Sequence, residues 1–177
     1  MSLEVKTELR IANILLGVLV SLLMVAVMAC GGTADEEDLK PIVVEALDAF
    51  AEELVSDRPG DADAYAERLQ AYLESNPEFF GSAAALLDPS GEVIASPYVY
   101  STGEGYGVAD LVEPSYNIEE QEWFMGPLEA DAGVWTEPYF DAGGGDIWMI
   151  TRSVPLRDAD GVFAVVTTDL AVDDPNQ

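Results

Sequence analysis

The apolar residues change their spacing near residue 80, and this change limits the folds open to the chain. From residue 38 to residue 55 they recur at steps of three and four, which is typical of an amphipathic helix with Pro41 near its first turn. A second helix is predicted from a cap at Asp61 to about Ser75, where Asn76-Pro77 ends it. Beyond residue 80 the pattern becomes that of strands between tight turns.

The predicted strands are separated by short sequences rich in aspartate and glycine. These turn sequences are Asp88–Gly91, Asp141–Asp146 and Arg157–Gly161. The strands are expected at 81–87, 92–100, 134–140, 147–154 and 162–170. Two helices followed by about five strands with tight turns predict an α+β domain with an antiparallel sheet.

A long irregular stretch, 101–133, connects the second and third predicted strands. It holds one short helix, for which Asn117 is the expected cap and Glu120 the partner in a capping box. A connection of this length in a compact domain is usually functional. Its aromatic residues Tyr116, Trp123 and Phe124 form either the lid of the core or the wall of a pocket, whereas Trp148, in mid-strand, is expected in the core.

The first thirty residues have the features of a targeting segment. An apolar run at 11–29 follows Lys6 and Arg10, and Val27-Met28-Ala29-Cys30 resembles the lipobox at which lipoproteins are cleaved and acylated. We therefore predict a lipoprotein-type signal segment at 1–29, lipidation of Cys30, a tether at 30–37 and a single domain at 38–174. The alternative is an uncleaved transmembrane helix, since about 19 apolar residues can cross a bilayer. Either anchor places the domain on the extracytoplasmic face of the cell membrane.

The charge balance excludes whole classes of partner. The chain has 34 acidic and 7 basic residues, a net charge of −27, so its field repels nucleic acid. Because the acids follow no ligand spacing, a halophilic adaptation is favoured over a cation-binding protein, although an alkaline habitat could produce similar acidity. Binding of DNA or RNA is therefore not expected.

Residue types that support catalysis and metal binding are scarce. Histidine is absent, which removes the commonest general base and zinc ligand, and one cysteine cannot form an intrachain disulfide. Glu137 and Asp141 could be a glycosidase pair, but two neighbouring acids are expected by chance in so acidic a chain. The Asp158-Ala159-Asp160-Gly161 and triple-glycine (143–145) sequences are interpreted as turns, not as calcium or phosphate loops. We predict no enzyme activity, no cofactor and no metal site.

The sequence over about 35–174 resembles the Cache (PAS-like, PDC) extracytoplasmic sensor domains of bacterial and archaeal receptors. The resemblance implies a long N-terminal helix on one face of a five-stranded antiparallel PAS-like sheet, and a lidded ligand pocket on the other face. It rests on the order and spacing of Trp123-Phe124, Trp135–Asp141, Gly143–Gly145, Thr151–Pro155 and Gly161 followed by Val165–Leu170.

The resemblance also implies ligand-binding residues. The amino-acid-sensing branch has a tyrosine, then arginine-x-tryptophan-tyrosine, then a further tyrosine and a late aspartate. The matching positions here are Tyr116, Gln121, Trp123, Phe124, Tyr139 and Asp169. Gln121 stands where the arginine would clamp a ligand carboxylate, and an amide offers weaker donors. The site is therefore balanced toward a cationic or neutral ligand, unless Arg152 points inward instead of forming an ion pair between layers.

Two functions remain open from the sequence. The first is binding of an amine, an amino-acid-like compound or another small polar metabolite, with signalling through a separate membrane partner, because no kinase, methyl-accepting or cyclase segment follows the domain. The second is a structural or accessory envelope lipoprotein that keeps the fold without binding a ligand. The replacement of the arginine by Gln121 favours the second function.

Overall fold

The computed structural model describes residues 36–176. The predicted signal segment at 1–29, Cys30 and most of the predicted tether lie outside the described residues. The last two tether residues, 36 and 37, already belong to the first helix. No helix within 36–176 is both long enough and apolar enough to cross a membrane.

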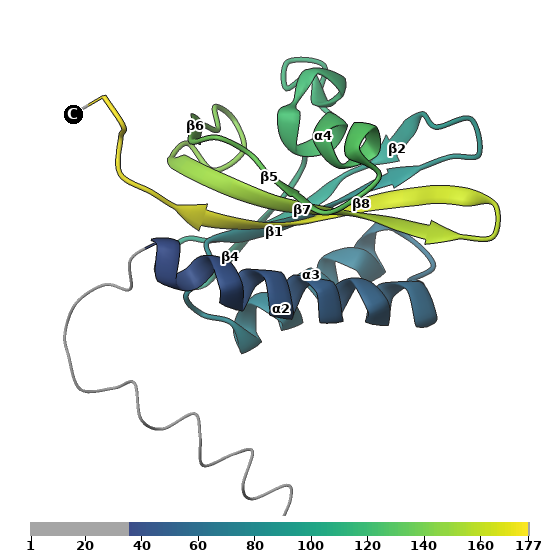
Figure 1. The fold of residues 1–177 in the computed structure, drawn as a ribbon, viewed down its shortest axis with the longest axis horizontal. Helices are drawn as coiled ribbons and strands as arrows, with labels where there is room; N and C mark the ends of the chain where they lie inside the picture. The colour runs from purple at the N-terminus through teal and green to yellow at the C-terminus, as the bar shows by residue number, and fades with distance from the viewer. Residues whose placement is uncertain (1–35, 177) are drawn as a thin grey trace, which may run out of the picture. The chain divides into compact units, whose positions relative to one another are not determined.

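Two antiparallel helices cover one face of a sheet (Figure 1). Helix α2 (Glu36–Ser56) buries an apolar stripe at helical spacing, which consists of Val43, Leu47, Phe50, Ala51 and Leu54. Helix α3 (Ala62–Ser75) begins where the Asp61 carboxylate accepts a hydrogen bond of 2.9 Å from the Ala64 backbone N–H. The cap predicted at Asp61 is thereby confirmed.

The strands form one antiparallel sheet, as the predicted fold class requires. Its order is β4-β3-β1-β8-β7-β5, with β2 paired to β1 and β6 paired to β7. The strands are β1 (Gly81–Leu87), β2 (Val93–Ala95), β3 (Pro97–Ser101), β4 (Tyr106–Asp110), β5 (Val134–Trp135), β6 (Tyr139–Phe140), β7 (Trp148–Asp158) and β8 (Gly161–Ala171).

The described sheet has eight strands where five were expected. The predicted strand 92–100 is divided at Ser96, whose backbone N–H turns to the Asp110 carboxylate (3.0 Å). The predicted strand 134–140 is divided before Tyr139, after Pro138, which has no N–H to donate to a ladder. Strand β4 lies in the stretch that was expected to be irregular.

The connection after β4 carries a 3-10 turn, η2 (Ile118–Glu120), and helix α4 (Glu122–Ala130), which lies over the other face of the sheet (Figure 1). The capping box predicted for Asn117 and Glu120 is wrong. Asn117 adopts a left-handed backbone (φ 53°), which asparagine tolerates, and its side chain makes no capping hydrogen bond. Gln121 instead occupies the N-cap position of α4.

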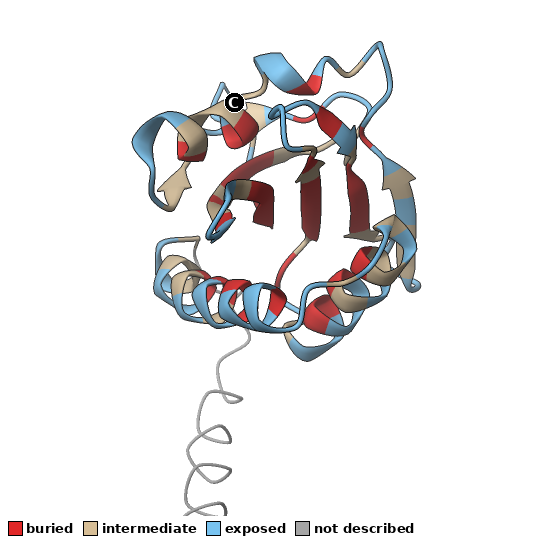
Figure 2. Ribbon diagram, turned by 90° about the vertical axis from the view of Figure 1, so that its right-hand side faces the viewer, coloured by how far each residue is buried: buried red, intermediate tan, exposed pale blue. Residues whose placement is uncertain are grey.

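The sheet separates two apolar layers, and its central strands are coloured as buried in Figure 2. The larger layer lies against α2 and α3 and includes Leu47, Leu69, Ile150 and Val166, whereas the smaller lies under α4. The side chains of successive residues in β8 point to opposite layers. Thr168 faces the helices, where its hydroxyl bonds to that of Tyr72 in α3 (2.8 Å), and Asp169 faces α4.

Candidate functional site

A narrow cavity lies between the sheet and α4. Its volume is about 10 Å³, which is about enough for one water molecule. Strands β1, β3 and β8 provide its floor, and the α4 region and the segment around β6 provide its cover. The lining residues are Ala83, Tyr98, Leu111, Tyr116, Trp123, Tyr139, Asp141, Thr167 and Asp169.

Four of the six residues predicted to bind a ligand meet in this cavity: Tyr116, Trp123, Tyr139 and Asp169. The other two lie behind its wall. Phe124 is buried and packs edge-on against Trp123, with ring centroids 6.0 Å apart. The Gln121 amide donates a hydrogen bond of 2.8 Å to the backbone oxygen of Tyr116, so it holds the loop that carries this tyrosine.

Asp169 is the most deeply placed charged group of the cavity. Its side chain is 4% exposed, and its Oδ1 accepts a hydrogen bond of 2.8 Å from the Thr151 hydroxyl, which also bonds to the Tyr139 hydroxyl (2.9 Å). Burial, with a smaller contribution from the Asp141 carboxylate, raises the pKa of Asp169 from 3.8 to about 7, against the lowering effect of the Thr151 hydrogen bond. A fraction of Asp169 is therefore neutral near pH 7.

Asp141 is a second buried carboxylate in the same cavity. The Tyr116 hydroxyl donates to its Oδ1 (2.8 Å) and in turn accepts from the Trp123 indole N–H (3.1 Å). Its Oδ2 accepts from the backbone N–H of Gly145 (2.9 Å). Burial raises the pKa of Asp141, while the hydrogen bonds from Tyr116 and Gly145 lower it.

The glycine-rich turn after Asp141 is more than a hairpin tip. A Cβ atom at Gly144 would overlap the Asp141 carboxylate, so the turn can fold over this group only without a side chain there. Asp141 was not among the residues predicted to bind a ligand. Strand alternation could have done so, because Asp141 follows Tyr139 by two residues and shares its face.

Tyr98 is a second residue of the cavity that was not predicted to bind a ligand. Its side chain is 2% exposed and lines the cavity, and its hydroxyl makes no hydrogen bond in the described part of the chain. This hydroxyl lies near enough to Asp169 to lower the pKa of that carboxyl, although the two groups lack hydrogen-bond geometry. Both groups crowd Gly81, where a Cβ atom would stand 2.9 Å from Asp169 Oδ2.

No basic side chain of the described residues lines the cavity. Arg152, which could have restored a positive charge, points to the other face of the sheet, 3.6 Å from Asp48 of α2. The remaining basic residues within 36–176 are likewise committed to acidic partners, in the pairs Lys40–Glu37, Arg58–Asp158, Arg68–Asp57 and Arg157–Asp131. The cavity therefore holds two carboxyl groups without a counterion from residues 36–176.

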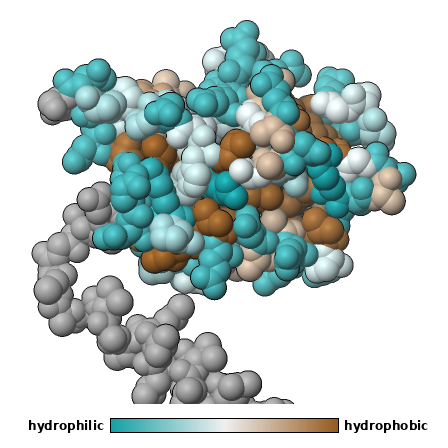
Figure 3. All heavy atoms as spheres, viewed as in Figure 1, coloured by the Kyte–Doolittle hydropathy of each residue, from teal (hydrophilic) through white to brown (hydrophobic). Residues whose placement is uncertain are grey.

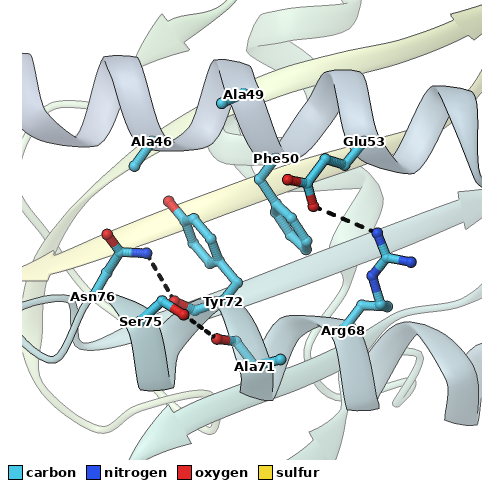
Figure 4. Close-up of a pocket in the computed structure, with 9 residues that line it drawn as sticks. All are labelled: Ala46, Ala49, Phe50, Glu53, Arg68, Ala71, Tyr72, Ser75 and Asn76. Atoms are coloured by element: carbon cyan, nitrogen blue, oxygen red, sulfur yellow. Dashed lines mark hydrogen bonds and ion pairs between the residues drawn. The ribbon is translucent and has the colours of Figure 1, made fainter. Parts of the chain in front are cut away.

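A larger hollow, of about 380 Å³, lies between α2 and α3 on the other side of the sheet (Figure 4). The stacked rings of Phe50 and Tyr72 form its floor, and Arg68 is paired with Glu53 at one end (3.5 Å). Its charged groups are mutually neutralised, and none of the predicted ligand-binding residues lies there. The smaller cavity is the better candidate site because its two buried carboxyl groups face no basic side chain of the described residues.

Most of the face seen in Figure 3 is hydrophilic, with apolar side chains in separate patches. No group of three or more acidic or cysteine side chains within 36–176 is arranged to hold a metal ion. The fold and the polar cavity together define the class of protein: a PAS-like α+β domain with a candidate site between the sheet and α4.

Residues 65–176 match the family model of the methyl-accepting chemotaxis protein-like, first PDC sensor domain, and the chain belongs to this family. This match confirms the resemblance to the Cache (PDC) sensor domains that the sequence indicated. The homologous domains are extracellular sensor domains of chemoreceptors and kinases. A search of curated proteins finds no match.

Solved structures share the fold. One is the extracellular domain of a protein described as a histidine kinase, soHK1S-Z6 (30% identity, TM-score 0.61, covering 75% of this chain and 54% of that one). Another is the ligand-binding domain of the Campylobacter jejuni chemoreceptor Tlp3 with L-norvaline (14% identity, TM-score 0.58, covering 76% of this chain and 52% of that one). A third is the ligand-binding domain of the Pseudomonas aeruginosa PAO1 amino acid chemoreceptor PctC with GABA (18% identity, TM-score 0.55, covering 78% of this chain and 60% of that one). The chain thus spans little more than half the length of these structures.

Proposed function

We propose that this domain binds a small cationic molecule in the cavity under α4, acts as a sensor on the extracytoplasmic side of the membrane and catalyses no reaction. One observation carries the proposal: Asp141 and Asp169 are both buried in the cavity, and no basic side chain of the described residues faces them. Burial of carboxylates without a counterion is costly. A cationic ligand supplies the missing charge.

The surrounding groups suit an amine better than an amino acid. Two similar domains were solved with L-norvaline and with GABA, each of which carries both an amine and a carboxylate. In this chain the position expected to hold a carboxylate carries Gln121, whose amide is already used by the Tyr116 backbone. Aromatic rings of Tyr116, Trp123 and Tyr139 can pack on the apolar part of an amine.

A ligand larger than one water needs the cavity to enlarge. Its floor consists of β1, β3 and β8, whereas its cover consists of α4, irregular segments and the two-residue strand β6. We therefore expect α4 to move outward when a ligand is admitted, with the sheet unchanged. Such a movement could be passed to a separate membrane partner, which is the signalling route that we propose.

The test is a thermal-shift screen at high salt with amines, amino acids and carboxylates. A compound that binds only the folded state must raise the melting temperature. We expect hits among the amines. Asp169→Ala should abolish them while the domain stays folded, and Asp173→Asn, at an exposed site, should retain them. Unfolding of Asp169→Ala would instead make Asp169 a structural acid.

The membrane anchor is a separate part of the proposal. We infer from the lipobox-like sequence that Cys30 is acylated and holds the domain at the membrane. Cys30→Ser should then release the protein into the soluble fraction of cells. The matched control is Thr33→Ser, which keeps the cysteine and should leave the protein in the membrane fraction. Retention of Cys30→Ser in the membrane would favour a transmembrane helix.

The second candidate function is an accessory envelope lipoprotein that no longer binds a ligand. The cavity of about 10 Å³ and the position of Gln121 behind its wall favour this function. A screen without any stabilising compound, together with an unchanged cavity in crystals grown with the same compounds, would support it.

A further inference from the structure

The cavity poses a charge problem while it is empty. Asp169 is 4% exposed and Asp141 is 5% exposed, and both face the same small space. Two buried negative charges without a counterion repel each other and lose their hydration. Asp141 has the better support, with donors on both oxygens, whereas Asp169 has the Thr151 hydroxyl on Oδ1.

A second observation points to a missing ligand. The hydroxyl of Tyr98 is buried in the cavity and has no hydrogen-bond partner within 36–176. Leaving a buried hydroxyl unpaired costs about 1–3 kcal/mol, which a bound donor or acceptor would recover. The unpaired hydroxyl and Asp169 crowd the same side of Gly81, so one small polar group could reach both.

We propose that the cavity exchanges the proton carried by Asp169 in the empty domain for the protonated primary amine of a ligand. This inference rests on the proposed function and adds the class of amine and its coupling to pH. In the exchange, the O–H bond of the Asp169 carboxyl breaks and its proton passes to the solvent buffer. The ligand's ammonium group takes its place, so the net charge of the site is unchanged.

The geometry favours a primary amine over a quaternary ammonium. A primary ammonium carries three N–H donors, and the cavity presents acceptors that can use them, on Asp169, Asp141 and Tyr98. A quaternary ammonium has no N–H, so it would meet the carboxylates by charge alone and would leave the Tyr98 hydroxyl without a hydrogen bond. Ligand selection is then made by hydrogen bonds as well as by charge.

The pH range of the exchange follows from the groups around Asp169. Those that face it are Tyr98 of β3, Asp141 after β6, Tyr139 of β6, Thr151 of β7, and Tyr116 and Trp123 on the cover. None of these groups is cationic, and burial raises the pKa of Asp169 to about 7. Alkylamines remain protonated well above this pH. Below it, release of one proton makes the affinity fall about tenfold for each pH unit.

The experiment follows the Asp169 carboxyl carbon by 13C NMR from pH 5 to pH 9, with Asp169→Asn to assign the signal. The probes are propylammonium, tetramethylammonium and propionate, each at the same salt concentration, and Asp173→Asn is the control for binding to surface acids. We expect the empty domain to titrate near neutral pH. Propylammonium should shift the titration of Asp169 to lower pH. The dissociation constant of propylammonium should rise about tenfold from pH 6 to pH 5. Tetramethylammonium and propionate should shift nothing.

The outcomes separate this inference from the proposed function. An Asp169 that stays ionised from pH 5 to pH 9 in the empty domain overturns the exchange, whichever compound binds. A compound that stabilises the domain without displacing the proton also overturns it, but leaves the binding function in place. If no compound in the wider screen binds, both fail.

Discussion

The neutral form of Asp169 has a consequence for folding that can be measured without a ligand. Its pKa is raised by burial from 3.8 in an exposed chain to about 7 in the folded domain. Below pH 3.8 the group is protonated in both states and does not distinguish between them. As the pH rises, the unfolded chain ionises first, so the free energy of unfolding falls until the folded group also ionises near pH 7.

The expected magnitude follows from the two values. A pKa that rises from 3.8 to about 7 corresponds to about 4 kcal/mol in total, at about 1.4 kcal/mol for each pH unit. Between pH 5 and pH 8 the loss amounts to about 3 kcal/mol, because the titration ends near pH 7. This range avoids the isoelectric point of about 4.1, where precipitation would interfere.

Asp169→Asn isolates this contribution. The amide is neutral at every pH, and its oxygen can still accept the hydrogen bond from Thr151. Denaturant unfolding of the variant and the natural protein, at constant salt, should give a stability difference that grows by about 3 kcal/mol in favour of Asn from pH 5 to pH 8. Asp173→Asn should give a constant difference. A constant difference for Asp169→Asn as well would refute the account of Asp169 as a buried neutral acid.

Three further predictions concern other parts of the domain. Gly144→Ala should displace the Asp141 carboxylate and destabilise the domain by about 1–3 kcal/mol in denaturant unfolding, whereas Gly105→Ala, with open space around it, should be nearly neutral. Tyr72→Phe should cost about 1–3 kcal/mol in the same assay, because it leaves the buried Thr168 hydroxyl unpaired; adding Thr168→Val should recover much of the loss, and no recovery would contradict the bond's role. Lowering the salt should reduce the melting temperature, and indifference between about 0.1 and 3 M would count against screening of the charge of −27.

The sequence was sufficient for the two helices and most of the sheet, and for four of the residues that line the cavity. The helical stripe of α2 and the cap at Asp61 depend on local spacing, and both are present. The family resemblance predicted which residues share a site, because it implies both their order and the topology. Four of them do line one cavity: Tyr116, Trp123, Tyr139 and Asp169. These features are those that either a local pattern or a family pattern can specify.

The predictions that failed concern features that depend on the three-dimensional surroundings of a residue. The Asn117 cap depended on a backbone angle that tertiary packing sets, and the chain takes a left-handed conformation there. The direction of Arg152 could not be assigned before the two faces of β7 were known, and it faces Asp48 on the helix side. Asp141 was treated as part of a turn, although its spacing from Tyr139 placed it on the same face.

The two sides of the cavity differ in how freely they can change. Asp169 stands on β8, which is paired along its length with β7 and also with β1, so a substitution that shifts this strand would disturb the centre of the sheet. The opposite wall consists of α4, short irregular segments and the two-residue strand β6, which can accept new side chains at lower cost. Redesign of the cavity for other ligands should therefore keep Asp169 and the sheet, and vary only the residues of the cover.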